Sequence, residues 1–308
     1  MPGRASESPV IPYSNSPNRP HVMNSFILPL DKPVGPTSHD IIAMARRALG
    51  TRRIGHTGTL DPFASGLLLL CVNQATRLAE YMAELRKTYR AVARFDGSTT
   101  TDDHTGSMIT TSTAWQSLTE SALRAAFERQ RGTIAQRPTT YSAKKVGGER
   151  AYDLARRGNA VDLAPVMVTI YDIKIVAVNL PAVVFEVECS SGTYVRAIAR
   201  DVGNELHTGG YLRELRRTRI GPFDVTKAIR PEDMTERAAV ESKSVSLLAA
   251  LEHLPRLEIT EPEQRAIRFG QSLQRPGVKG TVVLEHGGEL VAIGLSDGDT
   301  LRPKKVFA

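Results

Sequence analysis

The residue type and setting of Asp61 are suited to nucleophilic chemistry. Asp61 is the only carboxylate in the glycine-rich segment 50–78, and Pro62 after it biases it to an extended backbone. An aspartate held on a bent loop can form covalent intermediates with sugars or activated rings. The same pattern also suits a turn-forming aspartate that caps its own loop. The residue alone leaves both interpretations open.

The neighbours of Asp61 favour a ligand site. Arg52, Arg53 and His56 place positive charge before it, and an apolar run at 67–72 indicates a buried strand after it. Glycines along the segment let the backbone bend and let a ligand approach closely. The segment lacks the Gly-Lys-Ser/Thr ending of a phosphate loop, and the chain has no dinucleotide fingerprint. We therefore expect no nucleotide cofactor.

Composition narrows the class of protein further. The chain of 308 residues has 40 Lys and Arg against 33 Asp and Glu, which gives a formal net charge of +7. Such an excess suits either a well-solvated surface or attraction to a polyanion, usually nucleic acid. Cys71 and Cys189 are far apart, and no His/Cys cluster has zinc spacing, so no metal is expected. Two thiols fit a reducing compartment, with one buried disulfide as the alternative.

The chain divides into three parts by composition. Residues 1–25 are rich in Pro, Ser and Asn without the apolar stretch of a signal peptide, which indicates a disordered leader. The longest apolar run is about six residues, far below the roughly 20 that span a bilayer. We therefore expect a cytoplasmic protein with no membrane contact. Residues 26–254 form the main body, and residues 255–308 form a small β-rich module.

Strand-like and helix-like segments interleave through the body and must position Asp61. They do not alternate regularly enough for a doubly wound parallel sheet, so an α+β fold is expected. A polar loop is predicted at 97–108. Strands are predicted at 26–30, 67–72, 87–95, 166–178 and 182–190, with a basic extended segment at 210–223. Helices are predicted at 39–50, capped by Thr37 or Ser38, at 75–85 and 118–131, and after the small residues at 191–193.

Five segments, in order along the chain, resemble the TruB-type pseudouridine synthases, which modify the T-loop uridine of tRNA at conventional position 55. They are "LDKPVGPTS" (30–38), "GHTGTLDPFASGLLLL" (55–70), "KTYRAVARF" (87–95), "RPTTYSAKKVGGERAYDLARRG" (137–158) and "SSGTYVRAIARDVG" (190–203). The resemblance covers about residues 26–230. It implies a mixed or antiparallel pseudouridine synthase core, a thumb-like insertion at about 137–165 and a PUA-like RNA-binding module at 255–308.

The resemblance also implies a reaction. A pseudouridine synthase breaks the C1′–N1 bond of uridine, turns the uracil and rejoins it through C5, which needs no redox cofactor and no metal. Asp61 would be the catalytic aspartate, and the uridine would have to leave its stack to reach it. Asp61 would attack C6 of the ring, attack C1′ of the sugar, or assist glycal formation by removing a sugar proton. The sequence leaves these three routes open.

By the same resemblance, three residues form the pocket around Asp61. Tyr89 would stack on the flipped base, Tyr194 would form a second wall, and a forked hydrogen bond from Arg196 would hold the carboxylate ionised. Without the resemblance, Tyr89 fits a half-buried strand tyrosine and Arg196 a solvated helix residue.

Three further residues match the pocket of the family. His56 would occupy the space that the flipped base leaves in the RNA, Leu215 would line the pocket, and Lys32 would lie at its edge. Each has a simpler interpretation as well. His56 fits a loop histidine that binds backbone, Leu215 a core leucine, and Lys32 a solvent-exposed turn lysine.

Basic residues are expected to hold the RNA backbone. In the thumb-like insertion, threonines stand before Tyr141 where the family pattern suggests a second proline, so the loop shape there is open. The expected RNA-backbone contacts are Arg52, Arg53, Lys144, Lys145, Arg150, Arg213, Arg216 and Arg217.

Three alternatives to a stand-alone tRNA isomerase remain. A noncatalytic RNA-binding or tRNA-folding factor would use the same basic cleft without needing Asp61. A glycosidase or base-excision enzyme would want a second carboxylate, and Asp102 and Asp103 are expected to be surface residues. A guide-RNA-dependent relative would share the core. The expected partner is the T-arm stem-loop of tRNA, bound by a monomer.

Overall fold

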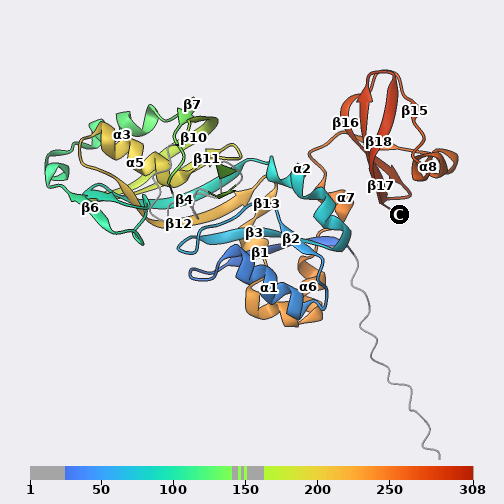
Figure 1. Cartoon of the computed structure of the whole chain (residues 1–308), viewed down its shortest axis with the longest axis horizontal. Helices are drawn as coiled ribbons and strands as arrows, with labels where there is room; N and C mark the ends of the chain where they lie inside the picture. The colour runs from blue at the N-terminus through green and yellow to red at the C-terminus, as the bar shows by residue number, and fades with distance from the viewer. Residues whose placement is uncertain (1–24, 141–144, 147–148, 151–162, 308) are drawn as a thin grey trace, which may run out of the picture.

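The computed structural model describes residues 25–140, 145–146, 149–150 and 163–307 (Figure 1). The predicted leader, residues 1–25, therefore lies almost wholly outside the described residues. In the described part, a nine-stranded mixed sheet forms the centre of the body. Its path runs β1 (Phe26–Lys32), β3 (Ser65–Val72), β12 (Tyr211–Ile220), β4 (Lys87–Arg94), β11 (Ala182–Cys189), β10 (Val166–Asn179) and β7 (Gly132–Gln136), with β2 (Ile54–His56) on β3 and β13 (Phe223–Asp224) on β12.

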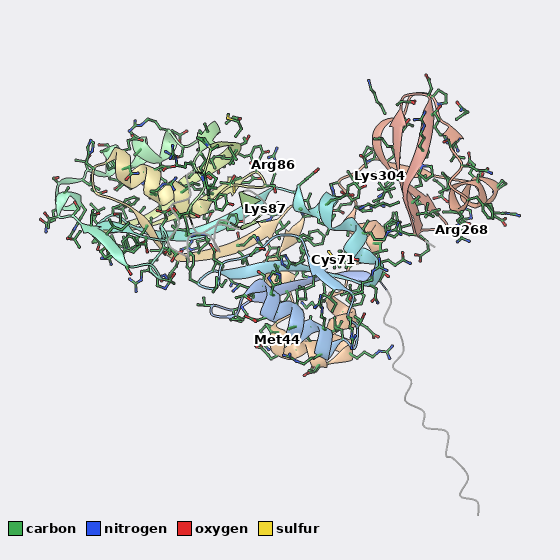
Figure 2. The ribbon with its side chains drawn as sticks, in the orientation of Figure 1. Met44, Cys71, Arg86, Lys87, Arg268 and Lys304 are labelled. Atoms are coloured by element: carbon green, nitrogen blue, oxygen red, sulfur yellow. The ribbon has the colours of Figure 1, made fainter. Side chains whose placement is uncertain are left out.

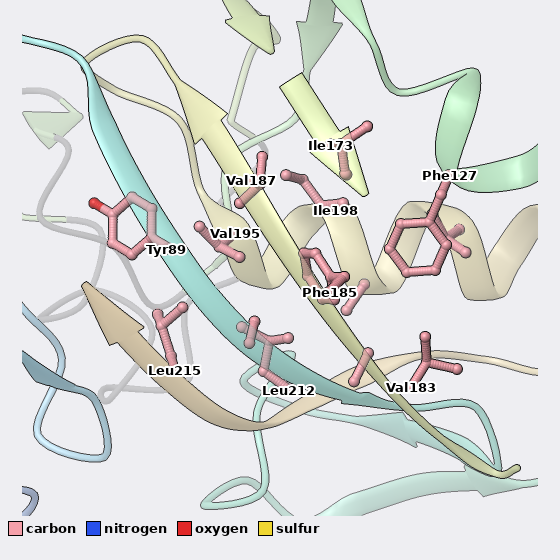
Figure 3. Packing of buried hydrophobic residues seen from close by; sticks show 14 of the residues in the cluster. Tyr89, Phe127, Ile173, Val183, Phe185, Val187, Val195, Ile198, Leu212 and Leu215 are labelled. Atoms are coloured by element: carbon pink, nitrogen blue, oxygen red, sulfur yellow. The ribbon is translucent and has the colours of Figure 1, made fainter. Parts of the chain in front are cut away.

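Two helices cover one face of the central strands. Buried side chains alternate along β4, as the sequence pattern at 87–95 predicts for a strand with one buried face. Helix α3 (Glu120–Glu128) and helix α5 (Val195–Glu205) pack on this face, where Phe127, Phe185 and Ile198 meet (Figure 3). This core fixes the N-terminus of α5 against the sheet.

A second layer lies over the other end of the sheet. Helix α1 (Ser38–Ala48) begins with a capping box, in which the side chain of Thr37 accepts from the N–H of Asp40 and Asp40 accepts from the N–H of Thr37. The buried face of α1 joins the core formed by β1 and β3. The segment η4 (Pro231–Thr235) contacts α1, and α6 (Arg237–Lys243) contacts η4 and β1 on the same side (Figure 1).

Shorter elements connect these layers and correct two expectations. The single helix predicted at 75–85 divides into η1 (Asn73–Leu78) and α2 (Ala79–Ala83). The predicted loop at 97–108 holds strand β5 (Gly97–Thr99), which pairs with β6 (Met108–Thr111). The other short elements of the body are η2 (Ala114–Ser117), β8 (Lys145–Val146), β9 (Glu149–Arg150), η3 (Val225–Lys227) and α7 (Leu247–Ala250).

A separate five-stranded sheet forms the C-terminal module. Its side of the junction with the body is apolar, and Phe307 packs beneath the guanidinium of Arg77. Lys304 belongs to the same module (Figure 2), and the neighbouring Lys305 pairs with Glu80 of α2. The module comprises β14 (Arg256–Glu258), α8 (Glu261–Arg268), β15 (Leu273–Gln274), β16 (Lys279–His286), β17 (Glu289–Asp297) and β18 (Thr300–Val306).

No helix in the described ranges combines the length and the apolar character needed to cross a membrane.

Strands β3 and β12 pair in parallel just after the Asp61 loop, and this pairing requires a glycine. Gly66 has φ of +105°, and a Cβ there would lie 2.2 Å from the carbonyl oxygen of Arg217. We expect Gly66→Ala to lower the free energy of unfolding by about 2–5 kcal/mol, since strain and overpacking add. Gly55→Ala is the control, because its nearest neighbour would be Thr76 Cγ2 at 3.8 Å. Equal urea midpoints of unfolding for Gly66→Ala and Gly55→Ala would contradict the expected loss of stability.

Candidate active site

A buried arginine links two carboxylates from distant parts of the chain. Arg196 lies in the first turn of α5, and its side chain is 5% exposed. Its Nε lies 3.0 Å from Oδ2 of Asp61, and its Nη1 lies 3.3 Å from Oδ2 of Asp103. Nη1 also donates to the carbonyl oxygen of Thr101 at 2.7 Å. One guanidinium therefore orients both acids.

The expectation that Asp102 and Asp103 are surface residues is wrong. Asp103 is 3% exposed and accepts hydrogen bonds from Thr101 and Thr105 in addition to its contact with Arg196. Asp102 lies 3.2 Å from Arg200, on the next turn of α5. The acids lie inside because the loop after β5 packs against β12, where Asp103 bridges to Leu212.

Backbone and hydroxyl contacts fix the loop that carries Asp61. The N–H of Leu60 donates to Oγ of Ser38 at 2.9 Å, and that hydroxyl donates back to the Leu60 carbonyl at 3.2 Å. The N–H of Gly35 donates to the carbonyl oxygen of Pro62 at 2.8 Å. The start of α1 and the turn before it therefore hold both sides of Asp61 in place.

A pocket of about 280 Å³ opens beside Asp61. Tyr89 on β4 and Leu215 on β12 are 9% and 8% exposed and supply an aromatic and an aliphatic wall. Figure 3 shows the Tyr89 hydroxyl directed away from the packed core that Leu215, Val195 and Ile198 belong to. The pocket is lined by residues 57–61, Lys87, Tyr89, residues 190–196, Leu215 and Arg217.

Gln136 is a residue of the site that the sequence did not indicate. It is 1% exposed at the end of β7. Its Oε1 accepts from the N–H of Tyr194 at 2.8 Å, and its Nε2 donates to the Tyr194 carbonyl at 3.2 Å. This pair of bonds fixes the residue that begins α5 and so fixes the direction of Arg196. No local pattern around Gln136 marks such a contact.

Lys32 and His56 lie outside the pocket lining. Lys32 is fully buried at the end of β1 and donates to the carbonyl oxygens of Pro33 and Pro36, so the interpretation as an exposed turn lysine is wrong. Burial lowers the pKa of Lys32 to about 8, although the negative charge of Asp61 acts to raise it. His56 is half-buried on β2 with its ring edge-on to His39, and burial lowers its pKa to about 4. His56 is therefore neutral at physiological pH.

The predicted RNA-backbone residues divide into surface and interior positions. Arg52, Arg53 and Arg213 are exposed, and Arg216 is half-exposed with a forked contact to Asp31 at 2.7 and 3.0 Å. The prediction for Arg217 is wrong, because it is 2% exposed on the inner side of β12. Lys144 lies outside the described residues. Lys145 and Arg150 lie on the paired strands β8 and β9, with only their backbone described.

Asp61 has a raised pKa, because protein atoms displace water around its carboxylate. Arg196 opposes this effect, and Asp103 adds to it. As a nucleophile Asp61 would have to be ionised, so the rate of a reaction at this site would fall as the pH drops through this raised pKa. We expect the acid limb of the single-turnover rate to have a midpoint above the ordinary value of 3.8. Rates measured from roughly pH 4 to pH 8 test this, and a limb at or below 3.8 would contradict it.

The chain is similar to known proteins that define first its class and then its family. Residues 46–195 match the TruB family pseudouridylate synthase (N terminal domain), and residues 196–254 match the tRNA pseudouridylate synthase B C-terminal domain. The class is therefore that of the pseudouridylate synthases, which are isomerases. A relative from Arthrobacter sp. (strain FB24), called tRNA pseudouridine synthase B, is 41% identical over 93% of this chain and 97% of its own. The chain belongs to the TruB family.

Other relatives and solved structures agree with this assignment. Proteins of the same name from Cutibacterium acnes and Mycobacterium tuberculosis are 41% and 39% identical over 91% of this chain and 96% and 95% of their own. The crystal structure of a Cbf5-Nop10-Gar1 complex contains a chain with a TM-score of 0.72 and 25% identity, with 92% of this chain and 85% of that chain covered. The crystal structure of the archaeal box H/ACA sRNP Nop10-Cbf5 complex contains a chain with a TM-score of 0.71 and 26% identity, with 94% of this chain and 87% of that chain covered.

Proposed function

We propose that the protein converts uridine 55 in the T-loop of tRNA to pseudouridine, with Asp61 as the catalytic aspartate. The observation that carries this proposal is the placement of Asp61 beside a pocket with an aromatic wall, held by Arg196 at 3.0 Å. The relatives named tRNA pseudouridine synthase B support tRNA as the substrate.

In this proposal each pocket residue has a part in the reaction. The flipped uracil stacks on Tyr89, a contact of the kind that contributes about 1–3 kcal/mol per base. Leu215 lines the pocket from the neighbouring strand, and Tyr194 forms a second wall. Arg196 keeps Asp61 ionised despite its burial and aims one oxygen at the nucleoside. Asp61 then attacks C6 or C1′, or removes a sugar proton on the glycal route.

Basic residues outside the pocket would hold the RNA. Arg52 and Arg53 lie before the Asp61 loop, and Arg213 and Arg216 line a groove of about 860 Å³ on β4 and β12. Residues 26–254 form the catalytic domain in this proposal, with the thumb-like insertion at about 137–165 closing on the stem-loop. Residues 255–308 serve as a PUA-like module for the acceptor arm.

A guide-RNA-dependent enzyme and a noncatalytic binder are the competing functions. The chain is 41% identical over 93% of its length to a relative named tRNA pseudouridine synthase B, against 25% identity for the chain from the Cbf5-Nop10-Gar1 complex. A pure binder has no need of a buried Arg196 linking two acids. Both observations favour a catalytic isomerase over a noncatalytic binder and over a guide-RNA-dependent enzyme.

The test uses the purified protein alone with an unmodified tRNA transcript and no guide RNA. Carbodiimide treatment and primer extension then locate each pseudouridine. We expect one modified position, in the T-loop, and no modification in a matched transcript that has cytidine there. Modification only after a guide RNA or partner proteins are added would contradict the stand-alone enzyme. Binding without modification under either condition would leave a noncatalytic RNA-binding factor.

A further inference from the structure

Arg217 is a buried cation at the floor of the pocket. Its Nε donates to the carbonyl oxygen of Leu67 at 2.7 Å, and its Nη2 donates to that of Gly58 at 3.1 Å. Within the ranges that the structure describes, its guanidinium has hydrogen-bond contacts but no ion pair with a carboxylate. Arginine is rarely buried without such a partner, because moving a charge out of water costs free energy. Burying the charge of Arg217 therefore costs folding free energy, which an uncharged residue with a purely structural role would not cost.

The contacts of Arg217 join three parts of the site. Gly58 belongs to the loop of Asp61, and Leu67 belongs to β3, which follows that loop. Across the β12–β4 pair, Arg217 stands opposite Tyr89, and its positive charge opposes the rise that burial causes in the pKa of the Tyr89 hydroxyl. A shift of Arg217 would move the catalytic loop and the aromatic wall relative to each other.

The positive charge of Arg217 acts on three other titratable groups nearby. It disfavours the charged forms of His56, Lys32 and Lys87, whose pKa values burial already lowers. The pKa of Lys87 falls to about 8. Three neighbouring cations are therefore weakened while Arg217 itself stays charged, since a guanidinium does not lose its proton in proteins.

Every chemical route for this reaction places negative charge on the uracil. Attack of a carboxylate at C6 pushes the C5–C6 π pair toward O4 and gives an enolate. Attack at C1′, or loss of a sugar proton to form a glycal, breaks the C1′–N1 bond and leaves its electron pair on the departing base. A fixed cation in a water-poor pocket stabilises such charge without reorganising during the reaction.

We propose that Arg217 is a positioning residue that fixes the Asp61 loop against Tyr89, and that its fixed charge in the pocket lining stabilises the negative charge that develops on the uracil. The proposal rests on the function proposed above, because it needs a uracil in the pocket. It assigns Arg217 a part in the chemical step and none in RNA binding.

The test compares Arg217→Gln and Arg217→Lys with wild type under single turnover on a T-arm hairpin, together with hairpin binding and thermal unfolding. We expect Arg217→Gln to slow the reaction by about 100-fold at all pH values with Kd unchanged within about twofold. At roughly pH 6.5, Arg217→Lys should keep more activity than Arg217→Gln. As the pH rises, the rate of Arg217→Lys should fall relative to that of wild type, since a buried ammonium there loses its proton. Lys32 and Lys87, with pKa values of about 8, are the precedents in this site.

A double-mutant cycle tests the coupling between Arg217 and Tyr89, which are paired across β12 and β4. In a Tyr89→Phe background, which lacks the hydroxyl but keeps the ring, we expect Arg217→Gln to slow the reaction by less than in wild type. Additive effects would overturn this coupling. A constant ratio of Arg217→Lys to wild type across pH, or a Kd that rises as much as the rate falls, would overturn the electrostatic role.

The remaining outcomes separate this proposal from the function on which it rests. Loss of folding in both Arg217 variants would show a structural role alone and overturn the proposal. Wild type that releases no product would overturn the proposed function, and the Arg217 proposal would fall with it. Active wild type with full activity in Arg217→Gln would overturn only the Arg217 proposal.

Discussion

Replacing Asp61 by asparagine is expected to slow pseudouridine formation by about 10⁴-fold or more, which is the scale of losing a nucleophile. The amide keeps the size and most hydrogen bonds of the side chain, so the pocket beside Tyr89 should stay intact. RNA affinity should change little, because Asp61 contributes a reacting atom and no phosphate contact. Chromatography of the digested nucleosides gives the rate, and fluorescence anisotropy gives the Kd.

The matched control for this substitution is Asp299→Asn in the C-terminal module. Asp299 is exposed and far along the chain from the pocket, so the same change of charge should leave the rate within about twofold. If the rate of Asp61→Asn exceeds a hundredth of the wild-type rate, Asp61 is not the nucleophile. A parallel loss of binding would show that the variant had disturbed the pocket itself.

Replacing Arg196 by glutamine is expected to damage both folding and catalysis. The change leaves Asp103 buried without its cation and removes the fork that orients Asp61. Breaking a buried pair from one side typically costs about 3–5 kcal/mol of stability. We expect a loss of that size in urea unfolding and a fall in rate of about 10³-fold, since the carboxylate is neither aimed nor held ionised.

The pH dependence distinguishes the electrostatic role of Arg196 from simple loss of structure. Arg196 opposes the raised pKa of Asp61, so its removal should raise that pKa further. Because activity requires the ionised acid, the acid limb of the rate profile should move to higher pH in Arg196→Gln. Arg196→Lys keeps the charge without the fork and should show a smaller displacement. An unmoved limb in Arg196→Gln would contradict the pairing as the source of ionisation.

The sequence predicted those features that local pattern and family motif specify. Alternation along 87–95 predicted the strand β4 with one buried face, and the small residues before Val195 predicted the start of α5. Family membership and the isomerase class are likewise confirmed by the comparisons. These features depend on short stretches of chain whose periodicity or motif is visible without the fold.

The errors concern charged residues whose burial depends on distant segments. Arg217 looks like its exposed neighbour Arg213 in sequence, yet the parallel pairing of β12 with β3 turns it inward to Leu67 and Gly58. Asp103 stands in a polar stretch and is buried only because that stretch packs on β12 beside Arg196. A local pattern of hydrophobicity carries no information about which charge will find a partner across the sheet.

One measurement tests the central claim most directly. A tRNA transcript carries tritium at C5 of the T-loop uridine only and is mixed with excess wild-type protein or Asp61→Asn. Because the new bond forms at C5, isomerisation releases that tritium to water. The account predicts complete release by wild type, none above background by Asp61→Asn, and equal binding by both. Binding without release by wild type, or release by Asp61→Asn at the wild-type rate, would contradict it.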